Sequence, residues 1–311
     1  MSSFENSRKI EEYTGWVKWT PTVEEWANFS VKPFPPCDMY ENEYLLVYME
    51  EDGRKKLVNQ YQYVKGELKK FGRGKISISF SDFKVDDEGN IKENKASKKQ
   101  TRIITPINDE QVAAIDLLNN DDITFKMLSG NFGSGKTLLT SVKAVEMLLT
   151  HTVEKIVWLR NTIGVKNTGG LGFLPGDLLE KMRPWIAPLI DNLKSEAAVL
   201  HMIKNNQLEI VALEHLRGRN FDNSVVVCTE AQNLDEDLMK LIIGRIGKDS
   251  YLLMEGDFKQ TDRVRFDKSQ GMKAAIKHLR GKRLFGYVDM PIDERSETAR
   301  LADLFEEEKG K

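Results

Sequence analysis

The sequence feature that most limits the possible folds of this chain is an eight-residue segment, Gly130-Asn131-Phe132-Gly133-Ser134-Gly135-Lys136-Thr137. It fits the pattern G-x-x-x-x-G-K-[ST] without a mismatch. The glycines let successive backbone N–H groups turn inward around phosphate oxygens, and a helix starting at Thr137 points its positive end at them. The lysine of this pattern reaches the terminal phosphates, and the hydroxyl after it can bind Mg²⁺. An apolar strand candidate precedes the segment and an apolar helix follows it, which favours a phosphate-binding loop over a glycine-rich turn without a ligand.

Short apolar runs alternate with helical patterns from about residue 103 onward. The expected strands are 123–128, 155–160, 208–213, 225–228, 251–255 and 284–288, and the expected helices are 109–118, 137–149, 235–246, 271–279 and 295–308. Strands that alternate with helices predict a parallel sheet with helices on both faces. We therefore expect residues 103–311 to form one α/β domain.

Residues 1–102 have a different character, with aromatic residues, prolines and short alternating runs. Residues 44–49 predict a strand, and Glu51-Asp52-Gly53 predicts a turn after it. Residues 76–83 alternate apolar and polar side chains, as a half-buried strand does. Residues 86–100 are charged and rich in turn formers, so we interpret them as a linker or loop. The expectation is a small β-rich N-terminal region with a linker.

The composition excludes several classes of protein. The formal net charge is only −2, which argues against a surface coated with basic charge, although a local basic groove remains open. The two cysteines, Cys37 and Cys228, do not make a disulfide framework, and the four histidines lack the spacing of a zinc site. No apolar stretch is long enough to span a bilayer. We expect a soluble, cytoplasmic protein with no membrane partner.

A second chemical group follows the apolar run 224–228. Thr229 and Glu230 come at its end, where P-loop ATPases place a metal-side group and a catalytic base. Glu230 is the candidate base that orients the attacking water, and the alternative is that it only caps the next element. Thr229 stands where such strands usually carry an aspartate that holds Mg²⁺. A hydroxyl can accept the same hydrogen bond without bringing a charge, so Thr229 is a candidate metal-side residue.

A third group follows the next predicted strand, 251–255. Asp257 is a candidate nucleotide contact, and Gln260 is a candidate catalytic residue that senses the γ-phosphate or its attacking water. Because the carboxyl ends of parallel strands meet at one sheet edge, these residues are expected beside the phosphate loop. The alternative is an ordinary Gly-Asp turn.

Taken together, these segments resemble the PhoH-like ATPases, and most closely the ATPase half of longer proteins in which a PIN nuclease domain comes first. The matching strings are LGFLPGD at 171–177, EK at 180–181, PW at 184–185, RGR at 217–219, EAQN at 230–233, GD-x-x-Q at 256–260 and ERS at 294–296. The resemblance covers roughly residues 103–308. Residues 1–40 are too short to hold the nuclease fold, so we expect no intrinsic nuclease centre.

The resemblance implies a RecA-like core related to superfamily 1 helicases, Mg²⁺-dependent hydrolysis of ATP, action on single-stranded RNA, and assembly into a homo-oligomeric ring, expected to be a hexamer. The chain departs from the family pattern at Thr229, where the family has aspartate. Asn131 and Phe132 replace small residues of the phosphate loop, and Asn161 replaces a proline. The loss of the aspartate leaves a second reading open, a nucleotide-binding regulatory or scaffold protein with weak or no hydrolysis.

Further residues receive roles from the same resemblance. Gln111 stands where helicase-like enzymes place an amide that reads the adenine edge, and Leu138, directly after the phosphate loop, is counted with the nucleotide contacts. Arg245 is a candidate arginine finger acting on a neighbouring subunit, and Arg295 is a candidate nucleotide or subunit contact. The alternative for Arg245 is a solvated arginine at a helix end.

Two basic stretches have open roles. Arg217 and Arg219 could hold phosphate or could form a structural ion pair. Residues 69–75 (KKFGRGK) combine charge, an aromatic ring and glycines, as single-strand binders do, but a solvated loop is the favoured reading.

Overall fold

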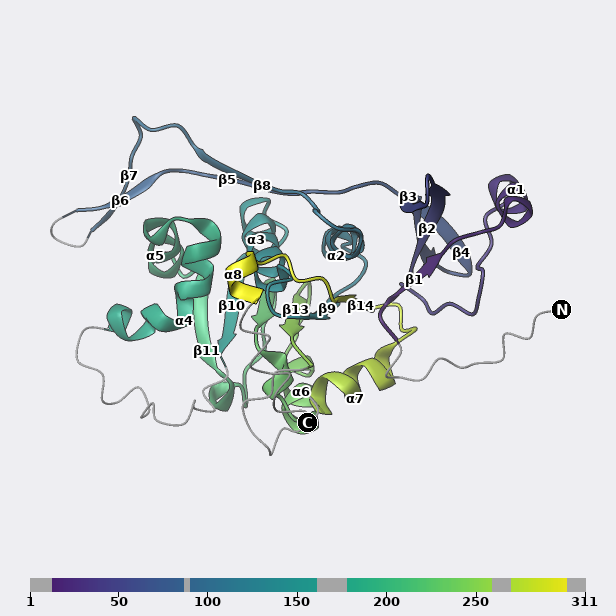
Figure 1. The fold of residues 1–311 in the computed structure, drawn as a ribbon. Coiled ribbons are helices and arrows are strands. Elements are labelled where there is room, and N and C mark those ends of the chain that lie inside the picture. Colours follow the sequence, from purple (N-terminus) through teal and green to yellow (C-terminus); the bar gives the residue numbers. More distant parts are fainter. Residues whose placement is uncertain (1–12, 87–89, 161–177, 259–269, 301–311) are drawn as a thin grey trace.

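The centre of the computed structural model is a parallel sheet of six strands in the order β11-β10-β12-β13-β9-β14 (Figure 1). The structure describes residues 13–86, 90–160, 178–258 and 270–300. The strands are β9 (Phe125–Gly130), β10 (Lys155–Arg160), β11 (Leu208–Ala212), β12 (Ser224–Cys228), β13 (Tyr251–Gly256) and β14 (Phe285–Met290). All five neighbouring pairs are parallel, as the alternation of strand and helix patterns predicts. All six expected strands are present.

Helices cover both faces of this sheet. The first face carries α2 (Asp109–Asn119), α3 (Lys136–Leu149), α4 (Leu178–Leu193) and α5 (Glu196–Lys204), and the second carries α6 (Glu236–Ile243), α7 (Gln270–Leu279) and the short turns η3 (Leu213–His215) and η4 (Ala231–Asn233). The alternation of side chains along β12 divides its residues between two cores: Val225 and Val227 join the first, and Val226 and Cys228 the second. A helix α8 spans Glu297–Arg300. The expected RecA-like architecture of a P-loop protein is confirmed.

A second, smaller sheet precedes this core. It has the order β1-β2-β3-β4, from β1 (Trp16–Trp19), β2 (Tyr44–Glu51), β3 (Arg54–Val64) and β4 (Glu67–Phe71), and α1 (Val23–Val31) packs on it. The predicted strand at 44–49 and the turn after it are confirmed, since Asp52 and Gly53 both take the positive φ that a tight hairpin turn requires.

The small sheet rests on α2. The hydroxyl of Tyr48 donates to Asp109 at 2.8 Å, and that of Tyr44 donates to Asp116 at 3.1 Å. Lys18 forms an ion pair of 2.6 Å with Glu110, whose side chain is buried. The N-terminal sheet therefore fixes the position of the start of α2 by side-chain contacts. This helix precedes β9, the strand that ends in the phosphate loop.

A long β-hairpin, residues 76–104, connects the two sheets and is called the hairpin arm below. Its strands are β5 (Ile76–Phe80), β6 (Phe83–Val85), β7 (Ile91–Glu93) and β8 (Gln100–Ile104), with β5 paired to β8 and β6 to β7. Residues 86–100, expected to be a linker or loop, contain the short strand β7 and the first residue of β8, and their other described residues lie outside helices and strands. One face of the arm is exposed, so its sequence is as polar as that of a loop.

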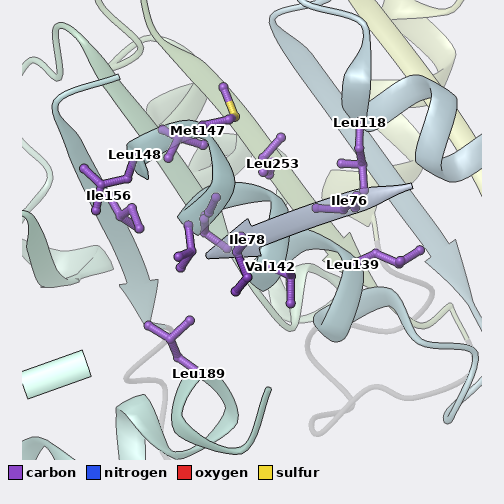
Figure 2. Close-up of a cluster of buried hydrophobic side chains, with 14 of the residues drawn as sticks. Ile76, Ile78, Leu118, Leu139, Val142, Met147, Leu148, Ile156, Leu189 and Leu253 are labelled. Carbon is purple, nitrogen blue, oxygen red and sulfur yellow. The ribbon is translucent and has the colours of Figure 1, made fainter. Parts of the chain in front are cut away.

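The hairpin arm crosses the outer surface of α3 and reaches α5 (Figure 1). Figure 2 shows Ile76 and Ile78 among side chains of α3, including Leu139 and Val142, and both isoleucines are at most 1% exposed. Burying an isoleucine side chain stabilises a fold by about 2 kcal/mol. The core of the predicted 103–311 domain thus continues into residues before 103. Within the described residues, no helix is long and apolar enough to cross a membrane.

Candidate nucleotide site

The phosphate loop joins β9 to α3 at the carboxyl edge of the parallel sheet. Gly130, with φ +143°, and Gly133, with φ +79°, adopt backbone conformations that other residues rarely adopt. A Cβ atom at Gly130 would collide with the backbone carbonyl of Met290 on the neighbouring strand, so β14 can lie this close only to a glycine. The loop therefore has the open backbone that the sequence pattern predicts.

Lys136 lies inside this loop and is only 6% exposed. Its Nζ donates to the backbone carbonyls of Gly130 at 2.9 Å and Asn131 at 2.8 Å. These bonds hold the ammonium group over the centre of the loop. Phosphate oxygens bound there would replace the carbonyls as its partners.

Thr137 contacts an acid that the sequence interpretation did not select. Its hydroxyl donates at 3.1 Å to Oε1 of Glu255, which lies near the end of β13 and is 3% exposed. Burial raises the pKa of the Glu255 carboxyl to about 7, and the charge of Glu230 adds to the rise. The signal in the sequence was a single acid within an apolar strand, YLLMEG at 251–256.

Glu230 follows β12 in a left-handed backbone conformation with φ 57°. Such a conformation costs a residue other than glycine about 1 kcal/mol or more, and it is found often at functional sites. The side chain of Gln232 connects this acid to the next strand: its Nε2 donates to Glu230 at 2.6 Å, and its Oε1 accepts from the backbone N–H of Asp257 at 3.1 Å. Gln232 was identified only as part of a family string.

These residues surround one pocket of 250 Å³ at the phosphate loop. It is lined by Phe132, Gly133, Gly135, Lys136, Thr137, Leu138, Glu230, Gln232, Glu255 and Asp257. Most of the predicted nucleotide contacts therefore share a single cavity, with one buried cation and several acids around it.

The segment after β14 packs against the phosphate loop. The guanidinium of Arg295 donates to the carboxylate of Asp293 at 2.7 to 3.0 Å and lies over the ring of Phe132 at 4.9 Å. The amide of Asn131 donates to the backbone carbonyl of Pro291. The structure thus places Arg295 beside the loop, as its predicted role requires.

Gln111 also lies beside the loop, at the start of α2. Its Nε2 donates to the carbonyl of Ser134 at 3.1 Å, and its Oε1 accepts from the backbone N–H of Ile107 at 2.9 Å. The amide therefore holds the loop in place in the free protein, and its reading of an adenine stays a prediction.

Arg245 and Arg219 lie at the opposite, amino edge of the sheet. Arg245 Nη1 donates to the backbone carbonyl of Arg219, and Arg219 pairs with Glu209 at 2.8 Å. The ion-pair reading of Arg219 fits this geometry. A finger role for Arg245 would act on another subunit and stays a prediction. Gln260 and the string at 171–177 lie outside the described residues.

The residues at the pocket suit Mg²⁺ bound together with a nucleotide. Mg²⁺ in such sites keeps several waters and takes one or two protein ligands beside the phosphates. Thr137 offers a hydroxyl, and Glu255 is a buried carboxylate already in contact with it. Among the described residues, no group of three or more His, Cys, Asp or Glu side chains forms a metal cage of its own.

A parallel sheet of this order, with a glycine loop, a buried lysine and a following hydroxyl at its carboxyl edge, defines the class of P-loop NTPases. The chain belongs to the family of PhoH-like proteins, whose model matches residues 103–299. This result confirms the family resemblance of its motifs.

Individual relatives agree with this assignment. Protein PhoH2 of Mycolicibacterium smegmatis is 34% identical over 198 residues, which cover 62% of this chain and 45% of the relative. The PhoH-like protein of Synechocystis is 30% identical over 72% of this chain and 71% of its own length. The chain spans about half the length of the first relatives it matches. Among solved structures, the Pif1 helicase from Candida albicans matches with a TM-score of 0.34 and 13% identity, over 65% of this chain and 44% of the helicase chain.

Proposed function

We propose that the protein binds ATP with Mg²⁺ in the pocket at the phosphate loop and hydrolyses it. The convergence of Lys136, Thr137 and Glu230 on one cavity carries this proposal. Lys136 would bind the β- and γ-phosphate oxygens, and Thr137 would hold the metal. The bound Mg²⁺ would neutralise charge on the phosphates.

Glu230 has the position of the catalytic base. It would accept a proton from a water molecule as the water oxygen bonds to the γ-phosphorus, and the bond from that phosphorus to the β–γ bridging oxygen breaks. The hydrogen bond from Gln232 restricts the carboxylate to one orientation. Asp257, connected through the same amide, would be close to the phosphate that leaves.

The proposal extends to single-stranded RNA and to a ring of identical subunits, expected to be a hexamer. Support for both comes from the family strings in the sequence. Arg245 lies at the amino edge, away from the pocket of its own subunit, so a finger role would require it to act on a neighbouring subunit. The exposed basic side chains of residues 69–75 offer one local surface for RNA phosphates.

A second candidate is a nucleotide-gated regulatory or scaffold protein with little hydrolysis. The observation that favours it is Thr229, a buried neutral residue where relatives with the full motif carry an aspartate. The two candidates share nucleotide binding and differ in turnover.

The test is Mg²⁺-dependent release of phosphate from ATP, with and without single-stranded RNA. Lys136→Ala should abolish release, and RNA should stimulate it in the unaltered protein. Light scattering with ATP present would report the size of any ring. Tight binding of ATP without release, with or without RNA, would reject the ATPase and support the regulatory protein.

A further inference from the structure

Glu255 is the deepest acid of the nucleotide pocket, and the mechanism above gives it no distinct role. It lies on β13, the strand between β12 and the phosphate-loop strand β9. Its hydroxyl partner, Thr137, is the residue that the loop pattern assigns to the metal. Because Glu255 contacts the hydroxyl of Thr137, it would lie close to a metal ion bound by that hydroxyl.

Glu255 and Thr229 occupy matching places on neighbouring strands. Cys228, the last residue of β12, pairs with Met254 of β13; Glu255 is the next residue of β13, and Thr229 directly follows the end of β12. Val227 and Leu253, two residues earlier, both belong to the core on the α3 side. Because side chains alternate along a strand, Glu255 also faces α3 and contacts Thr137 in its first turn, and Thr229 would continue the same alternation one residue past β12.

We infer that Glu255 supplies the metal-side carboxylate that Thr229 lacks, so that the acid of the magnesium site has moved one strand toward the phosphate loop. The inference rests on the proposed function and concerns only how this chain completes the site. Glu255 also accepts a hydrogen bond from the backbone N–H of Glu230, which ties it to the turn carrying the candidate base. Glu255 then provides the carboxylate on the metal side, and Glu230 orients the attacking water.

The alternative is that Glu255 has a purely structural role. A carboxyl buried to this extent is costly unless a partner stabilises it. The threonine hydroxyl and one backbone N–H are its assigned donors, while Glu230 repels its charge more strongly than Lys136 attracts it. A protonated carboxyl or a glutamine side chain could accept the same hydrogen bond from the threonine hydroxyl through its carbonyl oxygen. A structural role therefore does not need the charge, whereas a metal-side role does.

The test compares nucleotide affinity with Mg²⁺ and with EDTA, using a fluorescent, non-hydrolysable ATP analogue. In Glu255→Gln, the tightening of binding by Mg²⁺ should fall by about tenfold or more, the usual cost of losing such an outer ligand. Affinity in EDTA should stay equal or increase, because a negative charge near the phosphates is removed. A structural role would instead weaken both measurements together.

Two further variants keep the result interpretable. Glu255→Gln combined with Thr229→Asp should recover the Mg²⁺ dependence, because it returns a carboxylate to the neighbouring strand. Glu230→Gln is the matched control, an acid of the same pocket whose loss should leave the Mg²⁺ dependence intact. Thermal unfolding of each variant establishes that it is folded, and the neutral variant Glu255→Met replaces Glu255→Gln in the assay if the latter is not.

The outcomes separate the two proposals. If the unaltered protein binds the analogue more tightly with Mg²⁺ and Glu255→Gln does so equally well, the inference about Glu255 is wrong and the proposed function stands. If the unaltered protein binds no nucleotide under either condition, the proposed function fails, and the role of Glu255 fails with it.

Discussion

At the two edges of the parallel sheet, the pKa values of acidic side chains are shifted in opposite directions. At the carboxyl edge, burial raises the pKa of Glu255 to about 7, and burial also raises the pKa of Asp289. At the amino edge, Arg219 lowers the pKa of Glu209, with Lys155 as a further partner. Glu209 at the amino edge is paired with basic side chains, whereas Glu255 at the carboxyl edge accepts a hydrogen bond from the neutral hydroxyl of Thr137.

We interpret this difference as one of role: the ion pairs at the amino edge stabilise the fold, and the acids at the carboxyl edge serve ligand binding. The acid at the amino edge is satisfied by ion pairs and needs nothing further. At the carboxyl edge, Glu230, Glu255 and Asp257 line the pocket with Lys136, which is the one basic side chain among its described lining residues, and a buried acid in such an arrangement costs stability. Groups with strongly shifted pKa values are frequent at functional sites for this reason.

The largest expected contrast between the edges is in turnover. Glu230→Gln should lower the rate of ATP hydrolysis by about 100-fold or more, because it removes the base that accepts the proton. Binding of ATP should remain, because the amide replaces a group that does not hold the phosphates. The matched control is Glu209→Gln at the amino edge, which should hydrolyse ATP normally in a phosphate-release assay. Equal rates in both variants would contradict the role of Glu230.

The next contrast is in stability against pH. The pKa of Glu255 in the folded protein is about 7, above the 4.5 of a glutamate carboxyl exposed to water. The folded state thus binds this proton more tightly, so stability falls as pH rises from 4.5 to 7 and the cost is full above 7. Glu255→Gln should therefore raise the free energy of unfolding at pH 8, by up to about 3 kcal/mol, and change it little at pH 4.5. Urea unfolding without nucleotide, at both pH values, would measure the difference.

The smallest expected effect is that of Glu209→Gln on the free energy of unfolding, and its sign is opposite to that of Glu255→Gln. The lowered pKa of Glu209 means that its ion pairs stabilise the fold above its unfolded pKa and lose this effect as pH falls through the folded value. Glu209→Gln should lower the free energy of unfolding at pH 8 by about 0.5 kcal/mol, since the pairs are partly exposed. The same urea experiment measures it, and a gain in stability would remove the distinction between the edges.

Local patterns in the sequence were enough to predict much of this molecule. The phosphate loop, the strands around it and the motif acids are each defined by residues close together in the chain. Arg219 precedes β12, so its place at the amino edge also follows from the sequence once the strand is assigned. The role of Glu255 could not be found in this way. It depends on β13 lying beside β9, an adjacency between segments more than a hundred residues apart.

The first strand of the hairpin arm was predicted at residues 76–83, but its pairing with β8 was missed for a similar reason. Its pairing joins Ile76 to Ile104 across a charged segment, and periodicity within short windows carries no information about such a partner. The solvent-facing side of the arm looks like a loop because its polar residues face water. The two isoleucines that identify its buried side belong to a core formed mainly by α3 and the sheet.

The contact between this arm and α3 has a practical consequence for preparing the protein. A shortened version containing only the family-matched residues 103–299 would lack β5, and Leu139 and Val142 would lose the cover of Ile76 and Ile78. Newly uncovered apolar surface of this kind promotes aggregation during expression. A trimmed version of the protein that stays in solution should therefore begin before residue 76.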